Sequence, residues 1–249
     1  MLPRVIPCLL LRDRGLVKTV QFKKDTYIGD PVNAVRIFND KEVDELILLD
    51  IDATREGRGP DFEVIAEIAG ECFMPVAYGG GIRSFAEVRE VIRSGVEKVV
   101  INSSSYRSQQ VIAEASAVYG SQAVVGAVDA RKTFLGGHKA YSCSGTTEES
   151  TKLMDHIAAL VAAGAGEIFL NSIDRDGMMN GYDIELIRKV TAATRVPIIA
   201  SGGAGSVQDL VQAVREGGAS AVAAGSIFVF HGKHKAVLIN YPKDTFANA

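Results

Sequence analysis

Glycine-rich turns follow four apolar runs of this chain, and these turns are the residues best suited to bind an anion. Gly79-Gly80-Gly81 and Asn102-Ser103 lie in the first half, and Ser201–Gly205 and Ala224–Ser226 lie in the second. Glycine lets backbone N–H groups approach an oxyanion, and the helix that follows presents its positive N-terminal end. The two matched pairs predict two phosphate sites and a bisphosphorylated small-molecule ligand. For a single Gly-Gly pair, a simple turn of the chain explains the glycines equally well.

Carboxylates stand at the ends of the same kind of run. Asp129 closes the apolar run 123–128, and Asp174 and Asp176 follow the run 167–173. A carboxylate there can act as a general acid or base if its surroundings tune its pKa. Asp129 is the catalytic candidate, whereas capping of a turn explains Asp174 equally well. Asp52, just beyond another run, stays a candidate because strand parity no longer applies there.

Four charged residues, Arg4, Glu45, Lys98 and Glu167, each stand at the start of an apolar run. Two cations and two anions at one level could form a ring of ion pairs. From the residues alone a stabilising ring is the preferred interpretation. The alternative is a gate on a passage for a small molecule.

Eight apolar, β-rich runs alternate with helical patterns and must position these side chains. Asp30-Pro31 and Ser206 predict the starts of two of the helices. The runs are 4–10, 45–51, 74–79, 97–102, 123–129, 167–173, 196–201 and 219–224. The second half also repeats the first at an offset of 122 residues, as from Glu45 to Glu167. Eight βα units with an internal repeat predict an α/β protein, a closed (β/α)₈ TIM barrel. We expect a single domain over 1–249, with half-barrels of about 1–120 and 121–249. The alternative, an open doubly wound sheet, leaves the repeat unexplained.

Composition narrows the classes of partner. The net charge of −3 gives no electrostatic case for nucleic acid or an anionic membrane, and no apolar run is long enough to span a bilayer. Three cysteines without metal-type spacing suit a reducing cytoplasm, and the four histidines form no ligand cluster. We therefore expect a cytoplasmic protein with no metal and no cofactor.

Taken together, the motifs resemble the cyclase subunit of imidazole glycerol phosphate synthase along essentially the whole chain. The matching stretches are Val5–Leu9, Asp30-Pro31, Asp44–Leu46, Tyr78–Ile82, Lys98–Asn102, Gly120–Val124, Ser172–Gly177, Gly181–Asp183 and Ile199–Gly205. The resemblance implies a (β/α)₈ barrel that receives ammonia from a glutaminase subunit docked on its N-terminal face. It also implies addition of that ammonia to a ribulosyl-formimino nucleotide with two phosphates, giving imidazole glycerol phosphate and aminoimidazole carboxamide ribotide.

The resemblance also assigns roles to residues by position. Asp129 matches the general base, Lys18 lies in the loop after the first strand that contacts substrate, and Arg4, Glu45, Lys98 and Glu167 match the ammonia gate. That match replaces the preference for a merely stabilising ring. One phosphate site matches Gly81, Asn102 and Ser103, and the other matches Asp176, Gly177, Gly203, Ala224, Gly225 and Ser226.

Two departures from the family pattern point to a changed function. Leu10 stands where the family has the aspartate that serves as general acid, and Met178 stands where it has a threonine. Aligning the first and fifth strands requires a three-residue shift, which sets Leu10 opposite Asp129. General acid–base assistance contributes about 10²–10⁴-fold, so we expect impaired cyclisation.

Further stretches resemble a divergent branch of the family linked to acetamidino-sugar synthesis for surface polysaccharides. They are Leu9–Arg12, Asp50–Thr54, Cys72–Pro75, Gly217–Ser226 and Asn240–Pro242. That branch implies a second partner, a sugar amidotransferase that consumes the ammonia. The leading hypothesis is a subunit that supplies ammonia for amidination. The alternatives are the cyclase of histidine biosynthesis, with Asp52 or water replacing the lost acid, and a non-catalytic ammonia-conducting scaffold.

Overall fold

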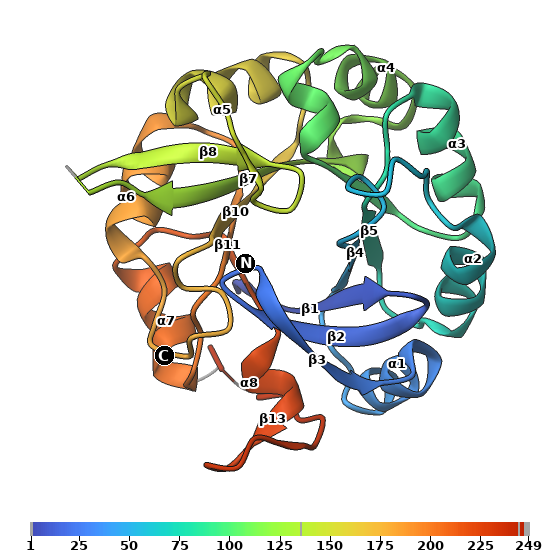
Figure 1. Ribbon diagram of the computed structural model, residues 1–249, viewed down its shortest axis with the longest axis vertical. Coiled ribbons are helices and arrows are strands. Elements are labelled where there is room, and N and C mark those ends of the chain that lie inside the picture. The colour runs from blue at the N-terminus through green and yellow to red at the C-terminus, as the bar shows by residue number, and fades with distance from the viewer. Residues whose placement is uncertain (1, 135, 244, 247–249) are drawn as a thin grey trace.

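The computed structural model describes residues 2–134, 136–243 and 245–246 and contains a closed barrel of eight parallel strands (Figure 1). β1 pairs with both β12 and β4, and β10 pairs with both β7 and β11, so the sheet has no free edge within the ring. The predicted (β/α)₈ TIM barrel is therefore confirmed. The barrel strands are β1 (Arg4–Arg12), β4 (Leu46–Asp50), β5 (Val76–Gly79), β6 (Lys98–Ile101), β7 (Val124–Lys132), β10 (Glu167–Ser172), β11 (Ile198–Ser201) and β12 (Ala221–Ala224).

Helices connect the strands and surround the barrel (Figure 1). The first begins where the sequence predicts it, because the Asp30 side chain accepts a hydrogen bond from the backbone N–H of Asn33 at 2.8 Å and Pro31 follows the cap. The helices are α1 (Pro31–Asp40), α2 (Phe62–Glu71), α3 (Phe85–Arg93), α4 (Gln110–Tyr119), α5 (Leu153–Ala162), α6 (Ile184–Ala193), α7 (Val207–Arg215) and α8 (Ser226–Val229), with short 3₁₀ turns η1 (Ser103–Tyr106) and η2 (Ser121–Ala123).

The internal repeat is visible in the helix bounds. α1, α2 and α3 start and end 122 residues before α5, α6 and α7, respectively. Even the capping box recurs, with Ser84 and Glu87 at the start of α3 and Ser206 and Asp209 at the start of α7. The sequence offset therefore corresponds to equivalent structural elements in the two halves.

Two apolar layers follow from the alternation of side chains along each strand. Inward-facing residues such as Ile6, Ile47, Val125 and Phe169 fill the barrel, and the outward-facing ones pack against the helices. Several inward positions are alanines, including Ala77, Ala127, Ala221 and Ala223. The barrel interior is thus apolar from the floor to the mouth.

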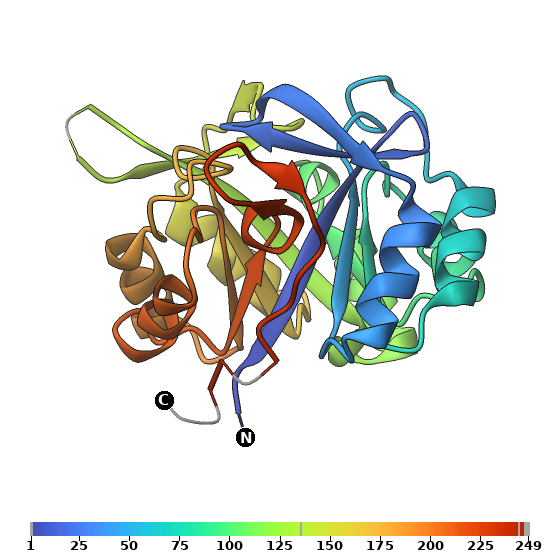
Figure 2. The same ribbon diagram turned by 90° about the horizontal axis from the view of Figure 1, so that it is seen from below.

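Short additional strands modify the mouth of the barrel, which the sequence did not predict. β2 (Gly15–Val20) and β3 (Lys23–Gly29) form a hairpin that crosses the end of the barrel opposite the start of β1 (Figure 2). β8 (His138–Ser142) and β9 (Thr147–Glu148) extend the sheet from β7, and β13 (Phe230–His231) pairs with β14 (Ala236–Val237). The antiparallel partners β2 and β8 carry β1 and β7 past their predicted ends at 10 and 129. No helix of the described chain is long and apolar enough to cross a membrane.

Candidate functional site

One cavity of about 760 Å³ opens at the carboxyl ends of the barrel strands, where (β/α)₈ barrels place their chemistry. Leu10 lines this cavity as well. The structure thus gathers the mouth residues predicted from the sequence around one space. They are Lys18, Gly81, Asn102, Ser103, Asp129, Asp176, Gly177, Gly203, Ala224, Gly225 and Ser226.

The loops after β11 and β12 form a cradle suited to an anion. Gly203 has φ +119°, and a Cβ atom there would lie 2.2 Å from the Gly181 carbonyl oxygen, so only glycine fits. A Cβ on Gly225 would lie 2.2 Å from Nζ of Lys18, which places that ammonium directly against the loop. Lys18 is only 5% exposed and forms no ion pair within the described part of the chain. A buried, unpaired ammonium is costly, and a bound anion would remove that cost.

The loops after β5 and β6 form the opposite side of the cavity. Gly81 has φ +71°, and a Cβ there would lie 2.9 Å from the Arg58 carbonyl oxygen. Asn102 donates from its side-chain nitrogen to the Asp129 carboxylate at 2.8 Å, and the Ser103 hydroxyl oxygen accepts from the backbone N–H of Cys143 at 3.0 Å. The Ser103 hydroxyl therefore keeps its own proton to donate. The buried side-chain oxygen of Asn102 has no partner within the described residues.

Asp129 lies at the point where β7 leaves the barrel, and it is only 9% exposed. Burial raises the pKa of its carboxyl to about 7; the hydrogen bond from Asn102 opposes that rise, and the nearby Asp176 charge adds to it. A carboxyl whose pKa lies near 7 can exchange a proton at neutral pH. Its position and its pKa suit the predicted general base.

The two other aspartates of the mouth hold loops in place. The Asp176 carboxylate accepts hydrogen bonds from the Thr19 hydroxyl at 2.8 Å and from the backbone N–H of Phe22 at 3.4 Å, which fixes the β2–β3 hairpin over the cavity. Asp174 does not line the cavity, and its carboxylate accepts from the backbone N–H of Lys132 at 2.6 Å. The Asp176 carboxylate is therefore occupied by the hairpin, and Gly177 lines the cavity next to it.

Leu10 extends the apolar barrel interior to the mouth. It is 8% exposed, belongs to the interior cluster with Ile47 and Val100, and pairs in register with Leu49 of β4 and Val17 of β2. β1 and β7 lie opposite each other in the barrel, and both Leu10 and Asp129 line the cavity. The side of the mouth opposite Asp129 therefore carries an isobutyl group. Met178, the second departure from the family pattern, is 43% exposed and does not line the cavity.

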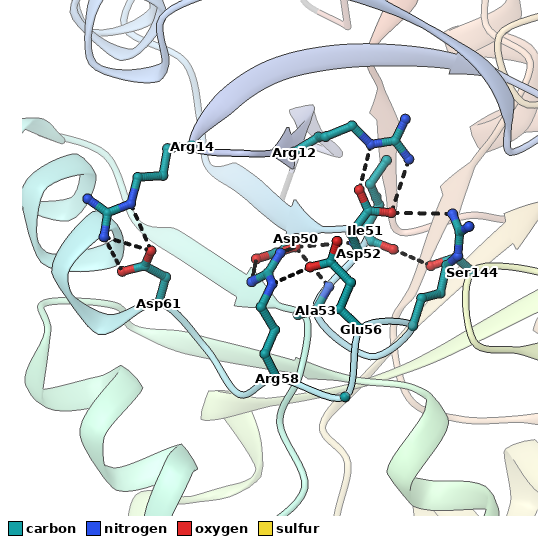
Figure 3. A network of polar contacts seen from close by, with 12 residues as sticks. Arg12, Arg14, Asp50, Ile51, Asp52, Ala53, Glu56, Arg58, Asp61 and Ser144 are labelled. Atoms are coloured by element: carbon teal, nitrogen blue, oxygen red, sulfur yellow. Dashed lines mark hydrogen bonds and ion pairs between the residues drawn. The ribbon is translucent and has the colours of Figure 1, made fainter.

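Asp52 lies outside this cavity, in a network of ion pairs on the rim (Figure 3). Its carboxylate accepts from Arg12 at 2.5 and 3.0 Å and from Arg55 at 3.3 Å. Asp50, on the neighbouring part of β4, is held in the same way by Arg58 at 2.6 and 2.9 Å (Figure 3). The Asp52 carboxylate is thus engaged by two guanidinium groups outside the cavity and does not face a ligand bound inside it.

At the closed end of the barrel the four predicted floor charges meet in one ring. Arg4 forms ion pairs with both Glu45 and Glu167. Lys98 contacts the same two carboxylates, at 2.9 Å and 3.0 Å. Each cation bridges both anions, so the ring closes across the axis of the barrel directly below its apolar interior.

Comparison with known proteins identifies the family. The model of the family described as histidine biosynthesis protein matches residues 4–235. The chain belongs to this family. A Pseudomonas aeruginosa protein provisionally named imidazole glycerol phosphate synthase subunit hisF2 is 56% identical over 239 residues, which cover 96% of this chain and 95% of the relative. A Caulobacter vibrioides protein named imidazole glycerol phosphate synthase subunit HisF is 43% identical over 228 residues, covering 91% and 88% of the two chains.

Three residues of this histidine biosynthesis family member that line the cavity were not predicted. Thr19 ties the hairpin to Asp176, and Tyr106 and Glu149 form part of the wall beside Asp129. All three lie on segments added beyond the ends of the predicted strands. Strand periodicity gives no signal there, because the position of these segments depends on antiparallel pairing and on tertiary contacts.

Proposed function

We propose that this protein is a synthase subunit that takes ammonia from a glutaminase partner and supplies it for amidination of a sugar in surface-polysaccharide synthesis. The relatives named above are synthase subunits by name, and the chain matches them along nearly its whole length. The glutaminase would dock on the N-terminal face, around the ring of Arg4, Glu45, Lys98 and Glu167. Opening of that ring would admit ammonia to the apolar interior. The three free cysteines suit a reducing cytoplasm.

The observation that carries the proposal is Leu10 in the cavity that contains Asp129. Cyclisation in this family requires a base and an acid, and an isobutyl group has no proton to transfer. The replacement considered from the sequence, Asp52, is engaged by Arg12 and Arg55 outside the cavity. Loss of the acid would reduce the rate by about 10²–10⁴-fold. Ammonia that reaches the mouth would then serve a second enzyme, a sugar amidotransferase.

Two other functions are supported by particular observations. The pKa of Asp129 near 7 and the glycine cradles favour the cyclase of histidine biosynthesis, acting on a bisphosphorylated ligand held by Gly81, Asn102 and Ser103 at one end and by Gly177, Gly203 and Gly225 at the other. The apolar Leu10 also fits a scaffold that only conducts ammonia between two other proteins. The unpaired, buried Lys18 favours a bound anion over such a scaffold.

Complementation of a bacterial histidine auxotroph that lacks the cyclase separates these functions. The unaltered chain should fail to complement, and Leu10→Asp should restore growth in part. Leu10→Asn is the control, because asparagine has the shape of aspartate but no acidic proton, and it should fail. Ready complementation by the unaltered chain would favour the cyclase. Co-purification of the tagged protein with a glutaminase and a sugar-modifying enzyme would support amidination, and a sugar-modifying enzyme absent from every such preparation would contradict it.

A further inference from the structure

The wall of the cavity on the side of η1 and β9 holds a carboxylate, Glu149, that the proposed function does not use. The backbone N–H of Glu149 donates to the Ala140 carbonyl oxygen at 2.9 Å, which fixes the residue beside β8. The hydroxyl of Ser142, a buried residue, donates to the Glu149 carboxylate. Both side chains line the cavity. Glu149 is thus held on the wall with one carboxylate oxygen still without a donor among the described residues.

Tyr106 and Asn102 give this wall more hydrogen-bonding capacity than the described chain satisfies. The Tyr106 ring stacks on His156 with 3.7 Å between ring centroids and 12° between planes, and the His156 ring nitrogen Nε2 lies 3.2 Å from the Ser105 hydroxyl. The buried Tyr106 hydroxyl and the buried Asn102 side-chain oxygen have no partner within the described residues. Burial raises the pKa of Tyr106, and the charges of Asp129 and Glu149 add to that rise, so the phenol stays neutral.

The charges on this wall are opposite to those of the Lys18 side. Glu149 and Asp129 bring two carboxyl groups to the wall, and no lysine or arginine of the described chain pairs with Glu149. Arg107 also lines the cavity, but it is exposed at the rim. Beside Glu149 a phosphate would be repelled, whereas a cation with N–H groups would meet acceptors on the Glu149 carboxylate and on the Asn102 side-chain oxygen.

We propose that this wall, formed by Glu149, Ser142, Tyr106 and Asn102, is a binding site for a cationic nitrogen group with several N–H donors. It is a third recognition point of the cavity, and it shares only Asn102 with the glycine cradle formed after β5 and β6. Glu149 supplies the charge and Ser142 fixes its rotamer. Tyr106 is held in place by stacking on His156 and forms the part of the wall next to Glu149. The site does not depend on whether the ammonia serves cyclisation or amidination.

The test uses acetamidinium, a small planar cation, and acetamide, its neutral isostere, as probes. Backbone amide shifts of the full chain are followed by NMR during titration at pH 7. Acetamidinium should shift the amides of Glu149 and its neighbours and bind roughly tenfold more tightly than acetamide, because charge-assisted hydrogen bonds are the stronger ones. Glu149→Gln should abolish that preference. Glu148→Gln is the matched control, because Glu148 pairs with Lys139 and does not line the cavity.

Equal binding of the two probes by the unaltered protein would overturn the inference, as would an unchanged preference in Glu149→Gln. Inorganic phosphate, titrated into the same samples, reports separately on the glycine cradles. Its affinity should be retained or slightly raised in Glu149→Gln, since a like charge has been removed. Failure of phosphate to bind would count against the cradles of the proposed function and leave the cation site standing.

Discussion

Replacement of Asp129 by asparagine should stabilise the protein, and the gain should grow as the pH rises. Folding moves this carboxyl from water, where its ordinary pKa is 3.8, to a buried position where the pKa is about 7. The native state therefore keeps its proton to a higher pH than the unfolded chain does. The free energy of unfolding falls as the pH rises from 3.8 to 7, by about 1.4 kcal/mol for each unit. Over this interval the loss reaches about 4 kcal/mol.

Asparagine has nearly the same shape and can still accept the hydrogen bond from Asn102, but it never ionises. Urea unfolding followed by circular dichroism between pH 5 and pH 8 measures the difference between the variant and the unaltered chain. We expect a stabilisation of about 1.5 kcal/mol at pH 5 that rises to about 4 kcal/mol at pH 8. The same variant should lose any reaction in which Asp129 exchanges a proton.

Asp52→Asn is the matched control, with an effect of opposite sign. Its carboxylate is paired with Arg12 and Arg55, so its loss should destabilise the protein by about 2 kcal/mol. A stabilisation by Asp129→Asn that stays constant from pH 5 to pH 8 would refute the reasoning, because only an ionisation coupled to folding produces the slope.

Three further substitutions test the cradle and the floor. Lys18→Gln should lower the affinity for inorganic phosphate about tenfold by calorimetry, because a charge-assisted hydrogen bond is lost; unchanged affinity would remove Lys18 from the site. Gly203→Ala should lower the free energy of unfolding by about 2 kcal/mol or more, since its φ is +119°, whereas Gly70→Ala, with open space around it, should not. Arg4→Met should lower the free energy of unfolding, measured with urea, by about 3 kcal/mol, because two carboxylates lose a shared cation. Arg36 is exposed, and Arg36→Met should change the free energy of unfolding by less than about 1 kcal/mol. Equal costs for the two arginines would contradict a buried ring.

The sequence predicts the barrel well because its signals are local and repeated. Continuous apolar runs locate the strands, and Asp30-Pro31 and Ser206 locate two helix starts that the structure confirms. Ile6, Cys8 and Leu10 all face the barrel interior, because β1 is a regular strand over that stretch. The glycine turns and the mouth polar residues meet in one cavity because the carboxyl ends of parallel strands share one end of the barrel.

The parts of the site that depend on pairing between distant segments cannot be predicted from local sequence patterns. The β2–β3 hairpin sets Thr19 against Asp176, which lies 157 residues further along the chain. Glu149 reaches the cavity only because β8 and β9 extend the sheet from β7. Likewise, no local pattern shows that Asp52 is engaged by Arg12, since the pair forms across two strands on the rim.

The floor ring has a consequence for how the two halves of the barrel assemble. Arg4, Glu45 and Lys98 belong to the first half, and Glu167 belongs to the second. The first half alone would therefore bring two cations and one anion together, with an uncompensated positive charge at the edge of an apolar interior. Docking of the second half neutralises that charge with one carboxylate, which contacts both cations. Charge balance thus selects the correctly closed barrel over a first half that pairs with another copy of itself.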